Sequence, residues 1–232
     1  TAVLGSTVAE VAARTLEAAR PYAAEALMCD EGELVFVDGI FSASGTNRSI
    51  TIEDLVLRLV PDSGDHPFNI KHSYEPDGST YPYGCHIAEI EIDPATCDVN
   101  IMRYTVVDDF GAVINPLMLE GQIHGGIAQG IGQAIHEYAA FDEQGQLVAG
   151  SLMDYRLPRA ADLPTFDIHF RSIPCKNNIL GVKGSGEAGA IGAPQAVIAA
   201  VTDALGIAHI DMPATPAAIW QALQNKQSGK VA

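Results

Sequence analysis

The chain has 232 residues, of which 47% are hydrophobic, and this suits one large domain or two small ones with a sizeable core. Its formal net charge of −16 argues against nucleic acid or an anionic membrane surface as a partner. No signal peptide and no long apolar stretch stand out, so no membrane insertion is expected.

The four cysteines are widely spaced and contain no CxxC pair, which argues against an iron–sulfur cluster or a zinc knuckle inside this chain. They are Cys29, Cys85, Cys97 and Cys175. Two disulfides are the alternative, but in a chain of this length we interpret the cysteines as buried thiols in a reducing compartment. The expected localisation is therefore cytoplasmic.

The first half of the chain is predicted to contain two helices and two β-hairpins. They are a helix over 8–28, a hairpin over 33–43, a short helix over 52–60 and a hairpin over 86–109. The first helix follows from apolar residues at helical spacing, and the first hairpin from the Asp38–Gly39 turn between two apolar runs. Thr51 is predicted to cap the short helix, which ends at Pro61.

The second half is predicted to begin with a long helix that Asn115 caps, that Pro116 opens, and that runs to about Phe141. Its apolar residues step by four and form one stripe. The stripe consists of Leu119, Ile123, Ile127, Ile131 and Ile135. Further along the chain, the predicted elements are a strand over 165–173, a helix over 194–205 that Gly206 closes, and a helix over 216–223.

Helices and strands are interleaved in this order, and the strands favour hairpins, which indicates the α+β class. The sheets are expected to be hairpin-rich and to accompany one long glycine-rich helix. Residues 1–232 are expected to form one domain, with subdomains 1–114 and 115–232 as an alternative division.

The long helix is rich in glycine, which is unfavourable in a helix interior. Five glycines at roughly 1 kcal/mol each cost on the order of 5 kcal/mol relative to alanine. They are Gly121, Gly125, Gly126, Gly130 and Gly132. Two explanations remain open: close packing against another backbone, or close approach of a ligand to the face that carries Gln122, Gln129 and Gln133.

A second glycine-rich element, GVKGSGEAGAIGAPQ at 181–195, contains a formal match to the GxGxxG dinucleotide fingerprint. The match is weak, because Glu187 would place a negative charge where the pyrophosphate lies. Two roles for Glu187 remain open at this point. A carboxylate held by glycines and desolvated is suited to act as a general base, whereas a solvated carboxylate would cap the following helix.

Two long stretches of the second half resemble the molybdenum hydroxylases. They are EGQIHGGIAQGIGQAIHEYAAFDEQGQLVAGSLMDYRLPRAADLPTFDI and GVKGSGEAGAIGAPQAVIAAVTDAL. The family includes xanthine oxidase, aldehyde oxidase and the large subunit of aerobic carbon monoxide dehydrogenase, and the chain is most similar to the bacterial large subunits of the last type. The motifs follow the family's order over essentially the whole chain. The implied fold is the C-terminal part of the molybdopterin-binding domain.

The resemblance implies roles for six residues of the two glycine-rich elements. Glu187 matches the family's catalytic glutamate, the base that deprotonates a molybdenum-bound hydroxyl, and Gln122 matches a glutamine that contacts the pterin. The backbone ahead of the glutamate is implied to lie against the pterin, at Lys183, Gly184, Ser185 and Gly186. The implied cofactor is molybdopterin, expected in its cytosine dinucleotide form. Its sulfurs hold the metal, so no protein side chains are expected as metal ligands.

The resemblance also implies partners, because this region is the last third or less of the family's molybdenum subunit. The expected partners are the N-terminal part of that subunit, an iron–sulfur subunit and an FAD subunit, which alone carry the iron–sulfur clusters and FAD. The implied activity is oxidation of an aldehyde, an N-heterocycle or a related small molecule, with water as the oxygen source. We expect the isolated chain to be inactive. Carbon monoxide oxidation and a non-catalytic assembly role are the alternatives.

The other conspicuous residues are expected to serve structure more than chemistry. They are His86, His124, His136, the strand-end turn pair Asp108 and Asp109, the loop residues Arg156 and Arg159, and Trp220, which is expected in the core.

Overall fold

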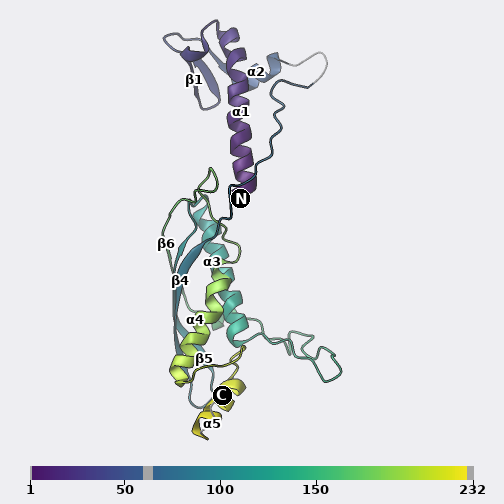
Figure 1. Ribbon diagram of the computed structural model, residues 1–232, viewed down its shortest axis with the longest axis vertical. Helices are drawn as coiled ribbons and strands as arrows, with labels where there is room; N and C mark the ends of the chain where they lie inside the picture. Colours follow the sequence, from purple (N-terminus) through teal and green to yellow (C-terminus); the bar gives the residue numbers. More distant parts are fainter. Residues whose placement is uncertain (1, 60–64, 229–232) are drawn as a thin grey trace. The chain divides into compact units, whose positions relative to one another are not determined.

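The computed structural model describes residues 2–59 and 65–228, and the chain divides into two units, Thr1–Asp77 and Gly78–Ala232 (Figure 1). Each unit has a three-stranded sheet and its own hydrophobic core, so the predicted α+β class is confirmed. The chain does not divide at residue 114, where the sequence indicated an alternative boundary. The hairpin before that position packs against helices that follow it, which places both in the second unit.

The first unit combines one long helix with a small antiparallel sheet. Its elements are α1 (Ala2–Leu27), a 3-10 helix (Glu31–Glu33), β1 (Leu34–Val37), β2 (Ile40–Ala43), β3 (Ser49–Thr51) and α2 (Ile52–Arg58). The predicted hairpin is present as β1 and β2, and Thr51 caps α2 by accepting a hydrogen bond from the Asp54 amide at 3.0 Å. Strand β3 is too short to give a periodic signal in the sequence. The predicted helix end at Pro61 lies outside the described residues.

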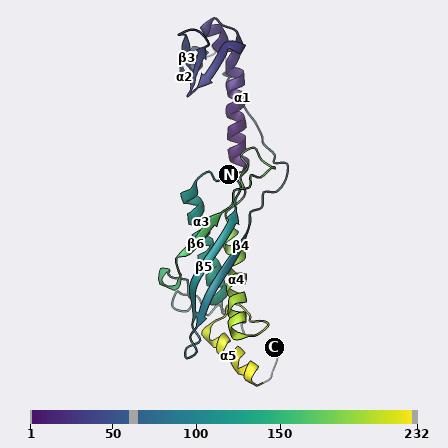
Figure 2. The ribbon, with the colours of Figure 1, turned by 90° about the vertical axis from the view of Figure 1, so that its left-hand side faces the viewer.

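The second unit is a three-stranded sheet with two long helices packed along it. Its elements are β4 (Tyr83–Ile92), β5 (Val99–Asp109), α3 (Pro116–Ile135), a 3-10 helix (Ala160–Asp162), β6 (Phe166–Phe170), α4 (Ala188–Leu205) and α5 (Pro216–Gln227). The strand order is β4-β5-β6, with β4 antiparallel to β5 and β6 parallel to β5. Helices α3 and α4 lie side by side against this sheet in both views (Figures 1 and 2).

Helix α3 begins as predicted, because Asn115 Oδ1 accepts a hydrogen bond from the Met118 amide at 3.0 Å and Pro116 follows the cap. All five members of the predicted apolar stripe are buried in the core of the second unit. The helix ends at Ile135 and not near Phe141, which is exposed. The apolar stripe has no member after Ile135, so a longer helix would bury no further apolar side chain of the stripe in the core.

Helix α4 begins at Ala188, well before the predicted start near Pro194. Pro194 occupies the helix interior and is buried, with its ring against Gly130 of α3. From the sequence, Pro194 is predicted in the first turn of the helix, where prolines are most favourable, but packing against α3 overrides that local preference. The predicted end is confirmed, since Gly206 closes the helix in the left-handed conformation with φ of 60°.

The earlier start makes α4 long and apolar enough, by length and composition alone, to cross a membrane, whereas no stretch of that length is predicted from the sequence. Its buried residues lie in the core of the second unit with the isoleucine stripe of α3. They include Ala193, Val197 and Val201, which are fully buried. The buried face of α4 is therefore part of the core of the second unit.

The two long helices approach each other so closely that three glycines form the contact. A Cβ on Gly126 would lie 2.9 Å from both Ala190 N and Gly189 Cα, and one on Gly189 would lie 2.7 Å from the Ile123 carbonyl oxygen. A Cβ on Gly130 would lie 2.6 Å from that of Ala193. Real Cβ atoms do not come this close to backbone, so close packing explains these glycines.

Two other glycines of α3, Gly121 and Gly125, have open space where a Cβ would stand. Packing within the described part of the chain does not explain them. Close packing and open surface therefore occur on different faces of the same helix.

The cysteines and Trp220 differ from expectation in their exposure. All four cysteines are free, so the disulfide alternative is wrong, but of the four only Cys97 is buried and Cys85 is exposed. Trp220 is 55% exposed, and the residue of α5 that enters the core is its neighbour Ile219.

The glycine contact predicts opposite effects for two neighbouring substitutions. Gly125→Ala should raise the free energy of unfolding by up to about 1 kcal/mol, because alanine favours the helix and the site has room. Gly126→Ala should lower it by about 1–3 kcal/mol, because the methyl group overlaps the backbone of α4. Urea denaturation of the two variants and the wild type measures both changes. Equal effects of the two substitutions would contradict the packing assignment.

Candidate functional site

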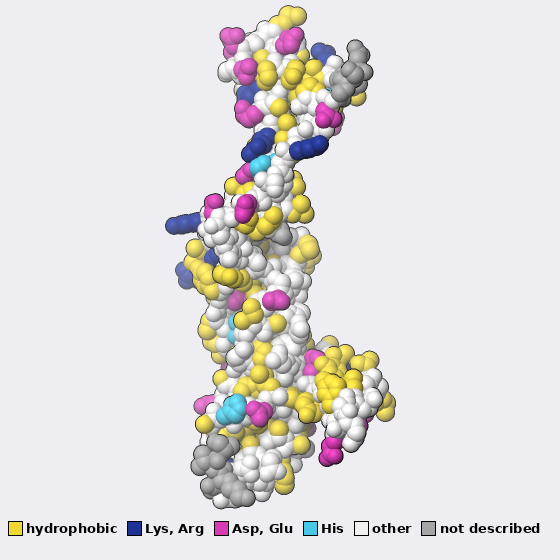
Figure 3. Space-filling view, turned by 45° about the vertical axis from the view of Figure 1, so that its right-hand side comes forward, with side chains coloured by type: hydrophobic (Ala, Val, Ile, Leu, Met, Phe, Trp, Pro, Cys, Tyr) yellow, Lys and Arg dark blue, Asp and Glu magenta, His cyan; other side chains and the backbone are white. Residues whose placement is uncertain are grey.

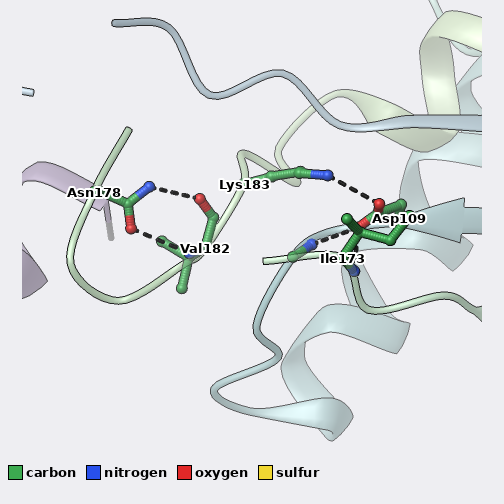
Figure 4. Close-up of polar contacts among 6 residues, drawn as sticks. Asp109, Ile173, Asn178, Val182 and Lys183 are labelled. Carbon is green, nitrogen blue, oxygen red and sulfur yellow. Dashed lines mark hydrogen bonds and ion pairs between the residues drawn. The ribbon is translucent and has the colours of Figure 1, made fainter. Parts of the chain in front are cut away.

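A buried ion pair holds the loop before α4 against the end of β5. Lys183 Nζ lies 2.9 Å from Asp109 Oδ2, and the two side chains are 7% and 3% exposed (Figure 4). The ammonium also lies 4.3 Å from the ring centroid of Tyr83, a favourable cation–π position. Asp109 Oδ1 accepts hydrogen bonds from the amides of Gly111 at 2.7 Å and Ile173 at 3.2 Å. One carboxylate thus connects the strand end, the segment after β6 and the glycine loop.

Both members of this pair remain charged in spite of their burial. Burial by itself would raise the pKa of Asp109, but hydrogen bonds from Lys183, Gly111 and Tyr83 together hold that pKa far below its usual value. Burial would likewise lower the pKa of Lys183, whereas the contact with Asp109 raises it above its usual value. The pair is therefore fully ionised across the neutral range.

Backbone hydrogen bonds extend this attachment along the loop. The Lys183 amide donates to the Phe110 carbonyl at 2.9 Å. Asn178 holds Val182 by both of its backbone groups, accepting from the amide at 3.1 Å and donating to the carbonyl at 2.8 Å (Figure 4). Gly181 turns the chain between them with φ of 66°, a conformation that favours glycine.

Glu187 occupies the N-cap position of α4, but its side chain does not cap the helix. Its carbonyl accepts from the amides of Ala190 and Ile191, both at 3.0 Å, while its carboxylate makes no capping hydrogen bond and is exposed. The side-chain capping considered for this residue is therefore wrong, and the desolvation considered for it is absent as well, because the carboxylate is exposed. Hydrogen bonds to its carbonyl fix the backbone of Glu187, and its exposed carboxylate is left available to contact another group.

The contact between α3 and α4 brings the segment of Gln122 beside the segment of Glu187. Gln122 comes one residue before Ile123, whose carbonyl faces Gly189, and Glu187 comes two residues before Gly189. The Gln122 amide is exposed. Gly121, Gly125 and Gly186 have nothing within 4 Å of a Cβ position, and Gly184 meets only a carbonyl oxygen at 3.6 Å.

These features leave bare backbone, one free amide and one free carboxylate around the junction of α3 and α4. Such a surface suits a flat polar group that needs hydrogen bonds and close approach. The side chain of Lys183 is not part of this surface, because its ammonium points into the protein toward Asp109. Ser185 is partly buried between the exposed Gly184 and Gly186.

Residues 1–164 match the family model described as a molybdopterin cofactor-binding domain. The chain is 34% identical over 231 residues to the carbon monoxide dehydrogenase large chain of Hydrogenophaga pseudoflava, a match that covers 97% of this chain. The chain belongs to the large-subunit family of the molybdenum hydroxylases. The predicted family is thus confirmed.

Two further members of this family support the assignment. The nicotine 6-hydroxylase large subunit of Paenarthrobacter nicotinovorans is 35% identical over 210 residues, 86% of this chain and 26% of that one. The crystal structure of quinoline 2-oxidoreductase from Pseudomonas putida 86 superposes with a TM-score of 0.80 at 32% identity, covering 92% of this chain and 28% of that one. This chain spans 29% of the carbon monoxide dehydrogenase large chain.

The structure corrects the interpretation of Asp108 and Asp109 as a turn pair. Both are buried at the end of β5, 3% and 2% exposed. The sequence contains a signal for this, because adjacent residues of a strand face opposite sides and two acids there need two separate partners. The lysine in the glycine loop is one of these partners, but their pairing joins residues 74 positions apart and cannot be read from spacing.

The remaining polar residues lie in other contacts. His124 is exposed on α3 beside the ring of Phe166, and both Arg156 and Arg159 lie near Asp162. His136 is buried, and burial followed by the charge of Arg156 lowers its pKa.

His136 and Arg156 also line a polar cavity of about 420 Å³ together with the β4–β5 turn. Among the residues that the structure describes, no group of three His, Cys, Asp or Glu side chains is placed to hold a metal ion.

The ion pair predicts a pH-dependent loss of stability in Asp109→Asn, which keeps the acceptor oxygen but removes the charge. Because the native pKa of Asp109 is depressed, its contribution is complete above the unfolded pKa of about 3.9 and is lost as pH falls below it. At pH 7 the variant should therefore be less stable by roughly 1–3 kcal/mol. The difference from wild type should shrink below about pH 4.

Urea denaturation of both proteins between pH 3 and pH 7 makes this measurement. Asp167→Asn is the control, since Asp167 pairs with Arg103 at the surface, where an ion pair contributes little. A difference between Asp109→Asn and wild type that stays constant over this range would contradict the charged pair.

Proposed function

We propose that this chain forms part of the active site of a molybdenum hydroxylase that oxidises an aldehyde, an N-heterocycle or a related small molecule. Water supplies the oxygen. The observation that carries the proposal is the free carboxylate of Glu187, whose backbone is fixed at the start of α4 beside open glycines. Family membership supports the reaction type, since the relatives are molybdopterin-dependent oxidoreductases.

The residues present fit a molybdopterin cofactor, for which we propose the cytosine dinucleotide form. When bound, the cofactor supplies the two-electron redox chemistry. The open backbone at Gly184 and Gly186 allows a flat group to approach without meeting a side chain, and the Gln122 amide is free to hydrogen-bond to it. The Lys183–Asp109 pair holds the loop in place, while Ser185 stands between the two exposed glycines.

Glu187 is the proposed general base. Oxygen transfer from water requires loss of a proton, and a carboxylate within reach of the reacting oxygen is a suitable acceptor. Because neither carboxylate oxygen caps α4, both remain able to take that proton. The fixed backbone positions the acceptor, which reduces the entropy lost on reaching the reactive geometry.

We further propose that activity requires the remainder of a large subunit, together with an iron–sulfur subunit and an FAD subunit in the cytoplasm. The chain spans 29% of the carbon monoxide dehydrogenase large chain. The loop after α3, residues 137–158, also projects from the helix end and carries exposed apolar side chains (Figures 1 and 3). They include Tyr138, Phe141, Leu152 and Met153, and such a surface is typical of an interaction site.

Carbon monoxide is the second candidate substrate, because carbon monoxide dehydrogenase large chains are among the relatives at 31–34% identity. The test is turnover by the complete complex with carbon monoxide, nicotine, quinoline and benzaldehyde as separate probes and an artificial dye as electron acceptor. Turnover of any organic probe supports the hydroxylase proposal, and turnover of carbon monoxide alone supports the second candidate. Molybdenum absent from the complex would support an assembly role and overturn both.

Glu187→Gln provides the sharpest test, because glutamine keeps the size of glutamate but cannot accept the proton. Turnover in the complete complex should fall by roughly 10²–10⁴-fold, the usual effect of a lost general base. Molybdenum content and thermal stability should stay at the wild-type level. Glu120→Gln is the matched control, since it removes an exposed carboxylate from α3 and should leave the rate unchanged.

A rate within threefold of wild type at full molybdenum content would contradict the assignment of Glu187 as base. Loss of molybdenum together with activity would instead give Glu187 a role in cofactor binding. The two outcomes are separated by measuring metal content on the same samples.

A further inference from the structure

A buried chain of three polar side chains crosses the hairpin beneath the start of α4. His86 of β4 lies between Tyr104 and Asp108 of β5, with its Nδ1 2.7 Å from the Tyr104 hydroxyl and its Nε2 3.6 Å from Asp108 Oδ1. Tyr104 is fully buried, and the side chains of His86 and Asp108 are 7% and 4% exposed. None of the three belongs to the proposed catalytic or cofactor-binding residues.

The central imidazole contacts a different polar group through each of its two nitrogens. Burial, together with the nearby Asp108 carboxylate, raises the pKa of Tyr104 above its usual range, so the hydroxyl keeps its proton in the hydrogen bond with His86 Nδ1. His86 Nε2 faces Asp108 on the other side of the ring. Gly84, opposite Asp108 in the hairpin, leaves room for this carboxylate, because a Cβ there would lie 1.8 Å from Oδ1.

The imidazole of His86 also supports α4 directly. A Cβ on Gly192 would lie 2.8 Å from two carbon atoms of the His86 ring, so the glycine lets the ring lie against the helix backbone. Gly192 is in the second turn of α4, five residues after Glu187. The orientation of the ring therefore affects the position of the first turn of α4, for which Glu187 is the N-cap residue.

The neighbouring acid holds the same segment from its other end. Asp109 binds Lys183, four residues before Glu187, and Asp108 faces the histidine under Gly192. Between these two points, Gly189 contacts α3. Asp109 thus contacts the segment before this turn directly, and Asp108 acts on the segment after it through His86. Neither contact involves the Glu187 carboxylate.

We infer that Tyr104, His86 and Asp108 are positioning residues that fix the turn carrying Glu187 through the contact of His86 with Gly192. The inference rests on the proposed function for its catalytic consequence, but its structural part concerns this chain alone. An apolar ring would fill the same space. The polar chain does more, because it specifies one ring orientation at the cost of burying three polar groups.

The test compares Tyr104→Phe and His86→Phe with wild type in the complete complex. Tyr104→Phe keeps the same ring, His86→Phe keeps an aromatic ring of larger size, and each removes the hydrogen bond between Tyr104 and His86. Amide hydrogen exchange at Ala190 and Ile191, which bond to the Glu187 carbonyl, should become at least tenfold faster. Tyr155→Phe is the matched control, because it removes a hydroxyl bonded to Glu137 at the far end of α3 and should leave these two amides unchanged.

Turnover provides the second readout, with whichever organic probe or carbon monoxide the wild type oxidises. In both variants we expect kcat to fall at least tenfold while KM stays within twofold, since the turn carries the base and not a substrate contact. Lack of turnover by the wild type would count against the proposed function only, and the exchange result would still decide the positioning.

Two results would overturn the inference. Exchange at Ala190 and Ile191 within twofold of wild type in both variants would show that ring packing alone supports the helix. Equally faster exchange throughout α5, or the same change in Tyr155→Phe, would show a general loss of stability. If His86→Phe does not fold, Tyr104→Phe decides alone, because it removes a single oxygen atom.

Discussion

The approach of α3 and α4 at Gly126 and Gly189 is the contact on which the rest of the second unit depends. With no side chain on either glycine, the two backbones meet directly, and the isoleucine stripe of α3 enters the core beside α4. The same contact carries the segments of Gln122 and Glu187 to one junction. A larger residue at either glycine would move the two helices apart and so disrupt both the core and the candidate site.

The end of β5 holds the start of α4 by charged contacts, in addition to the contact between the helices. A strand sends successive side chains to opposite faces, so Asp108 and Asp109 meet different partners although they are adjacent. One carboxylate holds the loop before Glu187 and the other faces the histidine under the helix after it. The chemistry proposed for Glu187 therefore rests on acids that take no part in it themselves.

Much of the fold follows from local signals, and the errors have physical causes. Caps at Thr51 and Asn115, the closing Gly206 and the stripe from Leu119 to Ile135 are readable because neighbours in sequence make them. The start of α4 is misplaced because Pro194 is an interior residue held by Gly130. Trp220 is exposed because Ile219 takes the core position of its helix.

The sequence by itself determined the family, the α+β class and the two glycine-rich elements, because these depend on motifs and short-range periodicity. Only the tertiary structure decided which glycines serve packing and which face open space, since that depends on what lies across from each one. It also decided which charged side chains contact one another. Lys183 meets Asp109 and His86 meets Asp108 because folding joins distant segments, and no spacing rule contains that information.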